Sequence, residues 1–558
     1  IVASLTATMI YQQEEFCDVP NLDVLSLLFD SDLCQSREDT KIHIEAANDS
    51  NFITKSQARD LTQHIAHGLR NKFGIGASGP GKDVVVCISS GQPLLPVLFY
   101  GVVAACGVYS AASSSFTTPE LARQISQGFS NLVICSPDTK EVTVAAAREC
   151  GVPLHRVLCL SSSPTWSLTS LDDNQNCISS EKLHWKRITD KEELENSLVC
   201  LLYSSGTTGP PKGVLLSHTN MVAASVITGE LAKGEIRRRE AAGTPPFEYR
   251  TLAHLPAAHI AGVQGYFVNP FYMGGPVFWM PKFDWPGFLD YNKRYRITFF
   301  FSVPPIYLLI AKSPLVTDQF DTLEVAVSGA ASMGKELQIA SSSKLGKGKT
   351  FISQTWGLSE TTGSVTAMPW GRSDDTGSVS PILPNMSLRL VDDNGKDIKP
   401  GERGEILVKG PIITKGYHNN PKATKEAFVD GWFCTGDVAE IRNGLIYIVD
   451  RKKELIKYKG LQVAPAELEA VLLSHPKILD AAVIGVEQNG SEVPRAFVVV
   501  GKKISEKEIK DFVKSKVASY KQLRGGVVFI DAIPKNPSGK ILRRQLRELV
   551  RGKSKSKL

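Results

Sequence analysis

The stretch Tyr203-Ser-Ser-Gly-Thr-Thr-Gly-Pro-Pro-Lys-Gly-Val214 contains the residue types that hold an anion. Apolar segments that read as buried strands, Val199–Tyr203 and Val214–Leu216, lie on either side of it. Small residues let backbone N–H groups converge on a phosphate, the hydroxyls add donors, and Lys212 adds positive charge. A flexible Gly/Ser linker would not lie so tightly between two buried strands. We therefore expect a phosphate-binding loop made of Ser204, Ser205, Gly206, Thr207, Thr208 and Lys212.

This loop is not a Walker A motif, because no Gly-Lys-Ser/Thr closes it and a strand rather than a helix follows. The segment Gly76-Ala-Ser-Gly-Pro-Gly-Lys-Asp83 comes closer, with the glycine spacing and the lysine. However, Asp83 replaces the hydroxyl that binds Mg²⁺ in that motif, and this segment also precedes a strand. We interpret it as a turn.

Composition limits the classes of protein. The 558 residues are 42% hydrophobic and 22% charged, which predicts two to four globular domains and excludes a small disulfide scaffold or a disordered chain. The net charge of +7 is partly located in the tail 551–558, so nucleic-acid binding is not expected. The longest apolar stretch, 94–109, is too short for a membrane span. The ten cysteines form no C-x-x-C pair, which favours reduced thiols in an intracellular protein.

Strand and helix signals alternate along the first part of the chain. Lys55–Phe73 has a helical apolar period, Asp83–Ser89 reads as a buried strand, and Thr118 precedes a helix that runs to about Phe129. The polar segment Gly229–Tyr249 reads as a mobile loop. We expect an α/β fold class, with a large N-terminal domain of stacked α/β sheets.

The last part of the chain reads as a small α+β domain that a hinge joins to the large one. The expected boundaries are 9–449 for the large domain, with Met9 as a plausible start, 450–454 for the hinge and 455–558 for the small domain. On charge alone, the segment 450–454 favours a solvated turn over a hinge.

Several separated segments resemble, in order, the adenylate-forming superfamily, which includes acyl-CoA synthetases, 4-coumarate–CoA ligases, beetle luciferases and the adenylation domains of peptide synthetases. The resemblance covers about Asn21 to Leu546 and is nearest to the 4-coumarate–CoA ligases and related acyl-CoA synthetases. The matching segments are Tyr203–Val214, Gly329-Ala-Ala-Ser332, Gln354-Thr-Trp-Gly-Leu-Ser-Glu360, Trp432-Phe-Cys-Thr-Gly-Asp437, Asp450–Gln462 and Pro534–Arg544. These motifs together are far more specific than any one of them.

The resemblance implies a nucleotide site. Its adenine turn is at Gly329 and Ala330, Trp356 stacks on adenine, and Ser359 reaches the α-phosphate. Its metal ligand is Glu360, which holds Mg²⁺, and its ribose partners are Asp437 and Arg451. Two positions depart from the usual pattern, since Trp356 replaces Tyr and Ser359 replaces Thr. Both substitutions keep the chemistry, a flat aromatic face and a hydroxyl.

The resemblance also makes the segment 450–454 a hinge with Lys453 as its pivot. It places Lys457 and Gln462 at positions where the 4-coumarate–CoA ligases have residues that serve the reaction and the adenylate. It places Gly460 near the pantetheine tunnel. Lys540 falls on the catalytic lysine, whose ammonium offsets the charge that develops when a carboxylate attacks the α-phosphate of ATP.

An acid pocket is expected around His259, in a segment that resembles Leu-Pro-x-x-His. Its residues would be His259, Ala261, Gly262, Gly329, Gly357, Gly363 and Val365. This set is small and apolar, which favours an aryl or medium-chain acid over an amino acid. The segment Leu255-Pro-Ala-Ala258 also lacks the Asp that would meet an α-ammonium group.

The resemblance implies an ATP-dependent acid–CoA ligase that uses ATP, Mg²⁺ and CoA and forms an acyl-adenylate. Two alternatives remain open. One is a luciferase-like oxygenase, although those enzymes have an aromatic residue where this chain has Ala261. The other is an enzyme that loads a carrier protein. A non-enzymatic acyl-binding protein would not need to retain Lys540. The ending Ser556-Lys557-Leu558 is a peroxisomal address for an import receptor, which predicts a peroxisomal location for a eukaryotic chain with this native end and a cytoplasmic one otherwise.

Overall fold

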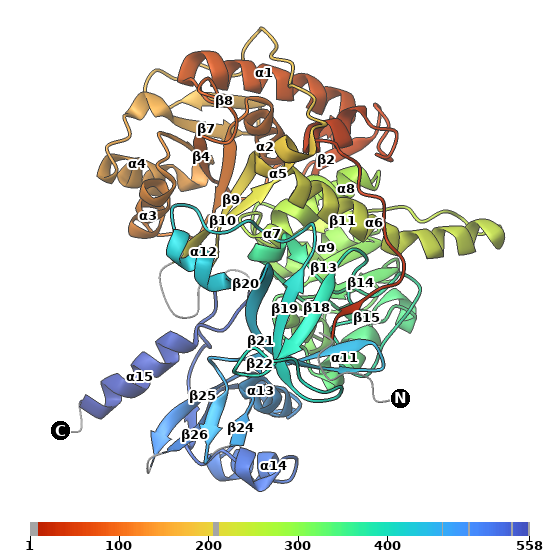
Figure 1. The fold of residues 1–558 in the computed structure, drawn as a ribbon, viewed down its shortest axis with the longest axis vertical. Helices are drawn as coiled ribbons and strands as arrows, with labels where there is room; N and C mark the ends of the chain where they lie inside the picture. The colour runs from red at the N-terminus through yellow and green to blue at the C-terminus, as the bar shows by residue number, and fades with distance from the viewer. Residues whose placement is uncertain (1–8, 205–210, 460, 489–490, 537–538, 556–558) are drawn as a thin grey trace.

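A large and a small domain make up the chain (Figure 1). The computed structural model describes residues 9–204, 211–459, 461–488, 491–536 and 539–555. The large domain contains a seven-stranded, a six-stranded, a four-stranded and a three-stranded sheet, and the small domain contains a three-stranded sheet. The predicted fold class is confirmed.

The seven-stranded sheet has a mainly parallel centre covered by helices. Its order is β10-β9-β5-β4-β6-β7-β8, with antiparallel strands at both edges. The strands are β4 (Val84–Ile88), β5 (Val108–Ala112), β6 (Leu132–Cys135), β7 (Val157–Ser161), β8 (Ser167–Ser170), β9 (Leu198–Ser204) and β10 (Lys212–Ser217). The α-helices between them are α2 (Leu94–Ala104), α3 (Thr118–Gly128), α4 (Lys140–Glu149) and α5 (Lys191–Asn196), and α1 (Lys55–Phe73) precedes β4.

Three larger sheets and the two-stranded pair β16 (Gly357–Leu358) and β17 (Gly363–Ser364) complete the large domain. One is β11 (Thr251–Ala253), β12 (Val277–Trp279), β2 (Lys41–Glu45) and β3 (Phe52–Thr54), and another is the parallel set β13 (Phe299–Ser302), β14 (Val325–Ser328) and β15 (Ile352–Gln354). The six-stranded sheet is β1 (Tyr11–Gln12), β18 (Ser387–Val391), β19 (Gly404–Lys409), β21 (Trp432–Arg442), β20 (Phe428–Val429) and β22 (Leu445–Arg451).

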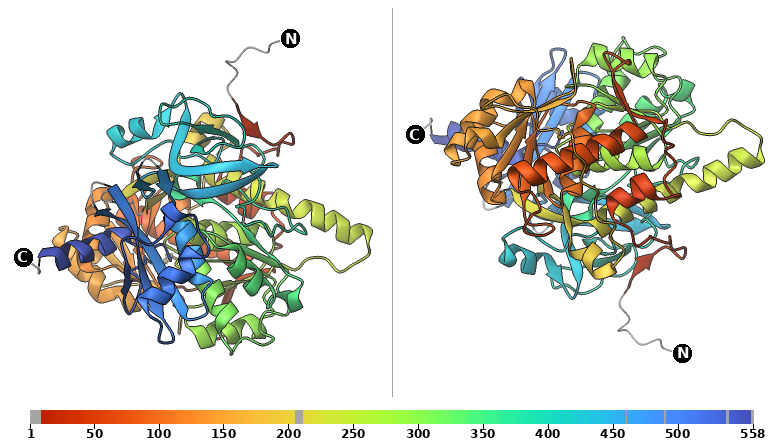
Figure 2. Two further views of the ribbon diagram at one scale, coloured as in Figure 1. Left: turned by 90° about the horizontal axis from the view of Figure 1, so that it is seen from below. Right: turned by 90° about the horizontal axis from the view of Figure 1, so that it is seen from above.

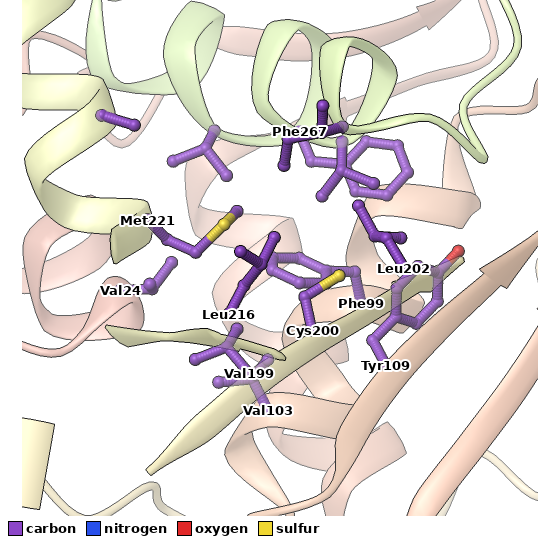
Figure 3. Close-up of a cluster of buried hydrophobic side chains, with 14 of the residues drawn as sticks. Val24, Phe99, Val103, Tyr109, Val199, Cys200, Leu202, Leu216, Met221 and Phe267 are labelled. Atoms are coloured by element: carbon purple, nitrogen blue, oxygen red, sulfur yellow. The ribbon is translucent and has the colours of Figure 1, made fainter. Parts of the chain in front are cut away.

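A dense apolar core joins the seven-stranded sheet to the helices beside it (Figure 3). Leu202 and Leu216 from the hairpin β9–β10 pack with Met221 of α6 (His218–Ala241) and Phe267 of the π-helix η4 (Val263–Val268). Burying such side chains stabilises the fold by roughly 1.5–3 kcal/mol each. Leu201, on the opposite face of β9, belongs to a second buried cluster, so the strand that enters the predicted phosphate loop is fixed from both faces.

Two local predictions differ from the structure. Thr117, not Thr118, caps α3, because Glu120 lies three residues after it and closes a capping box. The polar segment that begins at Gly229 is not a loop throughout, because α6 continues to Ala241 and projects from the body of the domain (Figures 1 and 2). Glu235 supports this extension by pairing with Arg238 and Arg239 one turn later.

The small domain follows β22, which ends at Arg451. The hairpin β23 (Ile456–Tyr458) and β24 (Leu461–Val463) comes first, and the sheet β25 (Ile478–Gln488), β26 (Ser491–Val500) and β27 (Val527–Phe529) follows. Its helices are α13 (Pro465–Leu473), α14 (Glu506–Lys514) and α15 (Arg543–Lys555). Among the described residues, no helix is long and apolar enough to cross a membrane, and the ten cysteines are free thiols.

Candidate active site

A cavity of about 650 Å³ lies between the two domains. The large domain contributes Trp356, Asp437 and Arg451 to its wall, and the small domain contributes Lys540. The sequence separates these residues by up to 184 positions, so the site exists only when both domains are folded and in contact. The cleft brings together the residues predicted for the ribose, the adenine and the reacting phosphate.

Asp437 is the centre of a hydrogen-bonded group in this cleft. It lies in β21, and strand pairing places it directly opposite Arg451 of β22. Its Oδ2 accepts a hydrogen bond of 2.8 Å from Nε1 of Trp356, and its Oδ1 lies 3.2 Å from Nε of Arg451. Asp437 is 4% exposed, and a buried carboxylate needs such partners to remain charged. The arrangement suits a carboxylate that accepts hydroxyl donors while its orientation is held from two sides.

Lys540 enters the cleft from a closed loop of the small domain. Lys535 and Ile541 pair across this loop, and the backbone N–H of Lys540 donates to Oδ1 of Asn536 at 2.8 Å. Burial, and secondly the positive charge of Arg451, lower the pKa of Lys540 to about 8, although Asp437 and Glu360 oppose the change. Lys540 therefore lies within electrostatic reach of both carboxylates, and it is mainly an ammonium at pH 7.

Glu360 lies in the short 3₁₀ turn Ser359–Thr361, which directly follows the cleft-lining residues Gly357 and Leu358. Its Oε1 accepts a hydrogen bond of 2.9 Å from the hydroxyl of Tyr417, and the ammonium of Lys212 lies 4.9 Å from the centre of the Tyr417 ring. Burial and the charge of Glu360 raise the pKa of Tyr417 far above its usual range, so its hydroxyl remains a donor. Tyr417 thus connects the predicted metal ligand to the predicted phosphate lysine.

The residues present fit a Mg²⁺ ion that the nucleotide brings with it. Within the described ranges, no group of three or more His, Cys, Asp or Glu side chains could hold a metal alone. Mg²⁺ is usually held by one or two carboxylates together with substrate phosphates and water. Glu360 supplies such a carboxylate, and at 9% exposure it is shielded from bulk water.

The predicted adenine turn at Gly329 and Ala330 and the segment 354–358 lie where two cavities meet. Gly329 follows β14, and Ala330 has a left-handed backbone with φ of 67°. A Cβ atom on Gly357 would lie 1.8 Å from the carbonyl oxygen of Gly363, so only glycine fits there. The cleft and a second, smaller cavity share Ala330, Gln354, Thr355, Gly357 and Leu358.

The second cavity, of about 210 Å³, begins at His259 and runs between α6, η4 and the sheet β13–β14–β15. His259, Ala261, Gly329, Gly357 and Gly363 line it, as expected for the acid pocket. Gly262 and Val365 do not. Gly262 packs against the backbone of Pro256 and Ala257, and Val365 belongs to the core. Burial, and secondly the charge of Lys540, lower the pKa of His259 to about 4, so its imidazole is neutral at pH 7.

The far end of this cavity is aromatic. Tyr249 stacks on Phe299 with ring centres 4.7 Å apart, and Trp370 lies 5.7 Å from Phe299. The charged residues of the lining, Glu324 and Arg372, are exposed at the rim. Sequence reasoning missed these aromatic residues and Tyr417, because no motif or spacing connects them to His259 or Glu360.

Other predicted residues lie outside the cleft or outside the described residues. Lys453, Lys457 and Gln462 are exposed, and the last two face each other across the hairpin β23–β24. Ser204 ends β9, and its hydroxyl lies 3.4 Å from the carbonyl oxygen of Lys212. Ser205, Gly206, Thr207, Thr208 and Gly460, together with Ser556-Lys557-Leu558, lie outside the described residues. The roles of all these residues stay predictions.

Comparison with known proteins places this geometry in a family. Residues 34–418 match the AMP-binding enzyme model, and residues 467–540 match the AMP-binding enzyme C-terminal domain.

The chain is 52% identical over 551 residues to a protein of Emericella nidulans that carries the name acyl-coenzyme A synthetase, covering 97% of this chain and 98% of that one. It is 34% identical to a phenylacetyl-CoA ligase of Aspergillus niger, covering 97% and 99%. ATP-bound MatB from Rhodopseudomonas palustris has a similar structure, with a TM-score of 0.79 and 27% identity, covering 94% and 98%. The chain therefore belongs to the AMP-binding enzymes, among the acyl-CoA synthetases and ligases.

Proposed function

We propose that this enzyme joins an aryl or medium-chain carboxylic acid to CoA through an acyl-adenylate, with ATP and Mg²⁺. The observation that carries the proposal is the junction at residues 354–358, where the apolar cavity meets the cleft that contains Asp437, Arg451 and Lys540. An acid whose body fills the apolar cavity would present its carboxylate at this junction. There it would meet the α-phosphate of a nucleotide in the cleft.

In the first step, an oxygen of the acid attacks the α-phosphorus of ATP, an acyl–oxygen–phosphorus bond forms, and pyrophosphate leaves. Lys540 offsets the negative charge on the phosphoryl oxygens while the two anions meet. Asp437 receives the ribose hydroxyls, and Trp356 offers its face to the adenine. Glu360 would hold Mg²⁺ together with the phosphates, and the ion would supply further positive charge when bound. In the second step, the CoA sulfur attacks the acyl carbon, and AMP leaves as the thioester forms.

The lining of the acid cavity supports the class of substrate. One end of the lining contains Tyr249, Phe299 and Trp370, and the charged residues of the lining, Glu324 and Arg372, are exposed to solvent. A flat aryl ring or a short alkyl chain would be desolvated there without leaving a charge unpaired. The relative named phenylacetyl-CoA ligase is consistent with an aryl acid. Hydroxycinnamates and phenylacetates are therefore our first candidates, followed by medium-chain fatty acids.

The test is pyrophosphate release with ATP and Mg²⁺ over a panel of these acids, each with and without CoA. We expect pyrophosphate with one acid class, and a thioester when CoA is present. Pyrophosphate without a thioester would contradict the ligase proposal and favour carrier loading or luciferase-like oxygenation. Lys540→Ala should abolish adenylate formation while nucleotide binding persists. Wild-type adenylation in that variant would contradict the mechanism.

We also propose that the ending Ser556-Lys557-Leu558 directs the enzyme to peroxisomes through the import receptor. The full chain with a fluorescent protein at its N-terminus should co-localise with a peroxisomal marker in a fungal or plant cell. Deletion of Leu558 should leave it in the cytoplasm. Peroxisomal fluorescence that persists after the deletion would contradict this role.

A further inference from the structure

Helix α10 (Pro304–Lys312) contacts the small domain near both of its ends. Near its first residue, a Cβ atom on Gly539 would lie 3.5 Å from Cγ of Pro305 and 3.6 Å from Cγ2 of Val303, so the loop that carries Lys540 touches the helix here. At its last residue, Nζ of Lys312 donates a hydrogen bond of 2.6 Å to the carbonyl oxygen of Ile478. At 1.5 Å per residue, the rise from Pro304 to Lys312 separates the two contacts by about 12 Å along the helix.

The second contact is connected to the loop of Lys540 by a short series of interactions. Ile478 begins β25, and the strand register shifts between Ile478 and Asp480. The carboxylate of Asp480 pairs with the ammonium of Lys535 at 2.6 Å. Lys535 in turn pairs with Ile541 and closes the loop around Lys540. The bond at the end of α10 therefore anchors the strand that holds the catalytic loop.

We propose that Lys312 is a positioning residue that docks the small domain on α10 in the arrangement that places Lys540 in the cleft. The proposal rests on the proposed function, in which Lys540 serves adenylate formation. The bond joins two domains, so a rotation of the small domain breaks it. It stabilises the arrangement seen here and no other, and it therefore shifts the population of the enzyme toward this arrangement.

The exposed position of the hairpin β23–β24 indicates why the Lys312 bond should affect adenylate formation and not thioester formation. Lys457 and Gln462 face solvent while Lys540 occupies the cleft. The resemblance places these two residues where residues serve the reaction and the adenylate. If they act when CoA attacks the adenylate, that step needs the small domain in another orientation. Loss of the Lys312 bond should then slow adenylate formation and leave thioester formation unchanged or faster.

The experiment compares Lys312→Met, which keeps the stem and removes the donor, with the wild type in each half-reaction. Adenylate formation is measured in single turnover with ATP and the best acid of the panel. Thioester formation is measured from prepared acyl-adenylate and CoA. We expect kcat of adenylation to fall about 10- to 100-fold with KM for ATP nearly unchanged, and Lys312→Arg to restore it. The matched control is Lys344→Met, which removes an ammonium-to-carbonyl bond of 3.1 Å to Ser313 within the large domain.

A second measurement does not depend on turnover. Amide hydrogen exchange in peptides that cover 478–488 and 534–546 should be faster in Lys312→Met than in the wild type, and unchanged in Lys344→Met. Equal adenylation rates, equal losses in both half-reactions, or unchanged exchange would each overturn the role of Lys312. A wild-type enzyme that adenylates no acid would instead overturn the proposed function, and the exchange data would still decide the docking role.

Discussion

The indole N–H of Trp356 donates a hydrogen bond of 2.8 Å to Oδ2 of Asp437, 81 positions further along the chain. The ring predicted to stack on adenine and the carboxylate predicted to bind ribose therefore hold each other in place. A tyrosine at position 356 carries no ring N–H, so this link is a consequence of the tryptophan that distinguishes this sequence from the usual pattern. The two recognition elements of the nucleotide are in this way preorganised as one unit.

Trp356→Phe should keep the aromatic face but release Asp437 from this bond. Because a hydrogen bond to a charged group contributes about 1.5–3 kcal/mol, we expect KM for ATP to rise about tenfold while kcat changes little. Steady-state pyrophosphate release at varied ATP measures this. Trp166→Phe is the control, since its indole N–H donates at 2.9 Å to Asn51, which lines neither the cleft nor the acid cavity. An unchanged KM for ATP in Trp356→Phe would show that the bond does not organise the nucleotide site.

Tyr417→Phe should raise the Mg²⁺ requirement. The hydroxyl of Tyr417 orients the carboxylate of Glu360, and loss of a partner that orients a metal ligand typically costs 10- to 100-fold in affinity. We expect half-maximal Mg²⁺ to rise about tenfold at saturating ATP, measured by pyrophosphate release and, without turnover, by Mn²⁺ electron paramagnetic resonance with a non-hydrolysable ATP analogue.

The control for this prediction is Tyr295→Phe, which removes a comparable hydroxyl bond of 2.7 Å to the carbonyl oxygen of Ala46. Tyr295 lines neither of the two cavities. If both variants need the same Mg²⁺ as the wild type, Tyr417 does not position the metal ligand.

Adenylation should depend on the protonation of Lys540. Its pKa is lowered to about 8, chiefly by burial, and the ammonium is the form that stabilises the phosphoryl oxygens. Activity is therefore present below this pKa and lost as the pH rises through it. We expect kcat/KM for ATP to fall above about pH 8, and the fall in kcat to occur at higher pH, because bound phosphates raise the pKa of Lys540.

Lys540→Arg tests the assignment of this alkaline limb. A guanidinium stays protonated over the whole range, so the residual activity of this variant should not fall near pH 8. An identical alkaline limb in Lys540→Arg would assign it to a different group.

The sequence predicts the nucleotide half of the site better than the rest. Trp356, Glu360, Asp437 and Lys540 lie in segments that can be read in register. The structure places Trp356, Asp437 and Lys540 in the wall of one cleft, and Glu360 is near enough to affect the pKa of Lys540. Tyr417 could not be found in this way. It reaches Glu360 because it forms a bridge with Val214 of β10, a tertiary pairing that leaves no periodic trace.

In the fold, too, elements that depend on local sequence are predicted better than elements that depend on tertiary contacts. The apolar period of Lys55–Phe73 predicts α1 with the bounds that the structure has, and a capping box at Thr54 fixes its first turn. The continuation of α6 to Ala241 was missed because its composition is polar. Salt bridges of Glu235 with Arg238 and Arg239 stabilise it, and composition does not show such contacts.

Gly265 should set the size of the acid that the enzyme accepts. It lies in η4, lines the acid cavity, and a Cβ atom there would meet nothing within 4 Å. Gly265→Leu therefore fills the cavity without a clash at its first atom. A cavity of about 210 Å³ loses a large share of its space to such a side chain. We expect kcat/KM to fall about 10- to 100-fold for the aryl acid and much less for a short-chain acid, measured over the same panel.

The control for this size effect is Gly234→Leu on the projecting part of α6. A Cβ atom at Gly234 also meets nothing within 4 Å, but this residue lines neither cavity. The acid profile of Gly234→Leu should equal that of the wild type, and thermal melting should show that both variants are folded. If Gly265→Leu retained the wild-type preference for the aryl acid, the acid body would have to lie elsewhere. The aromatic end at Tyr249, Phe299 and Trp370 would then be part of the core and not of the substrate site.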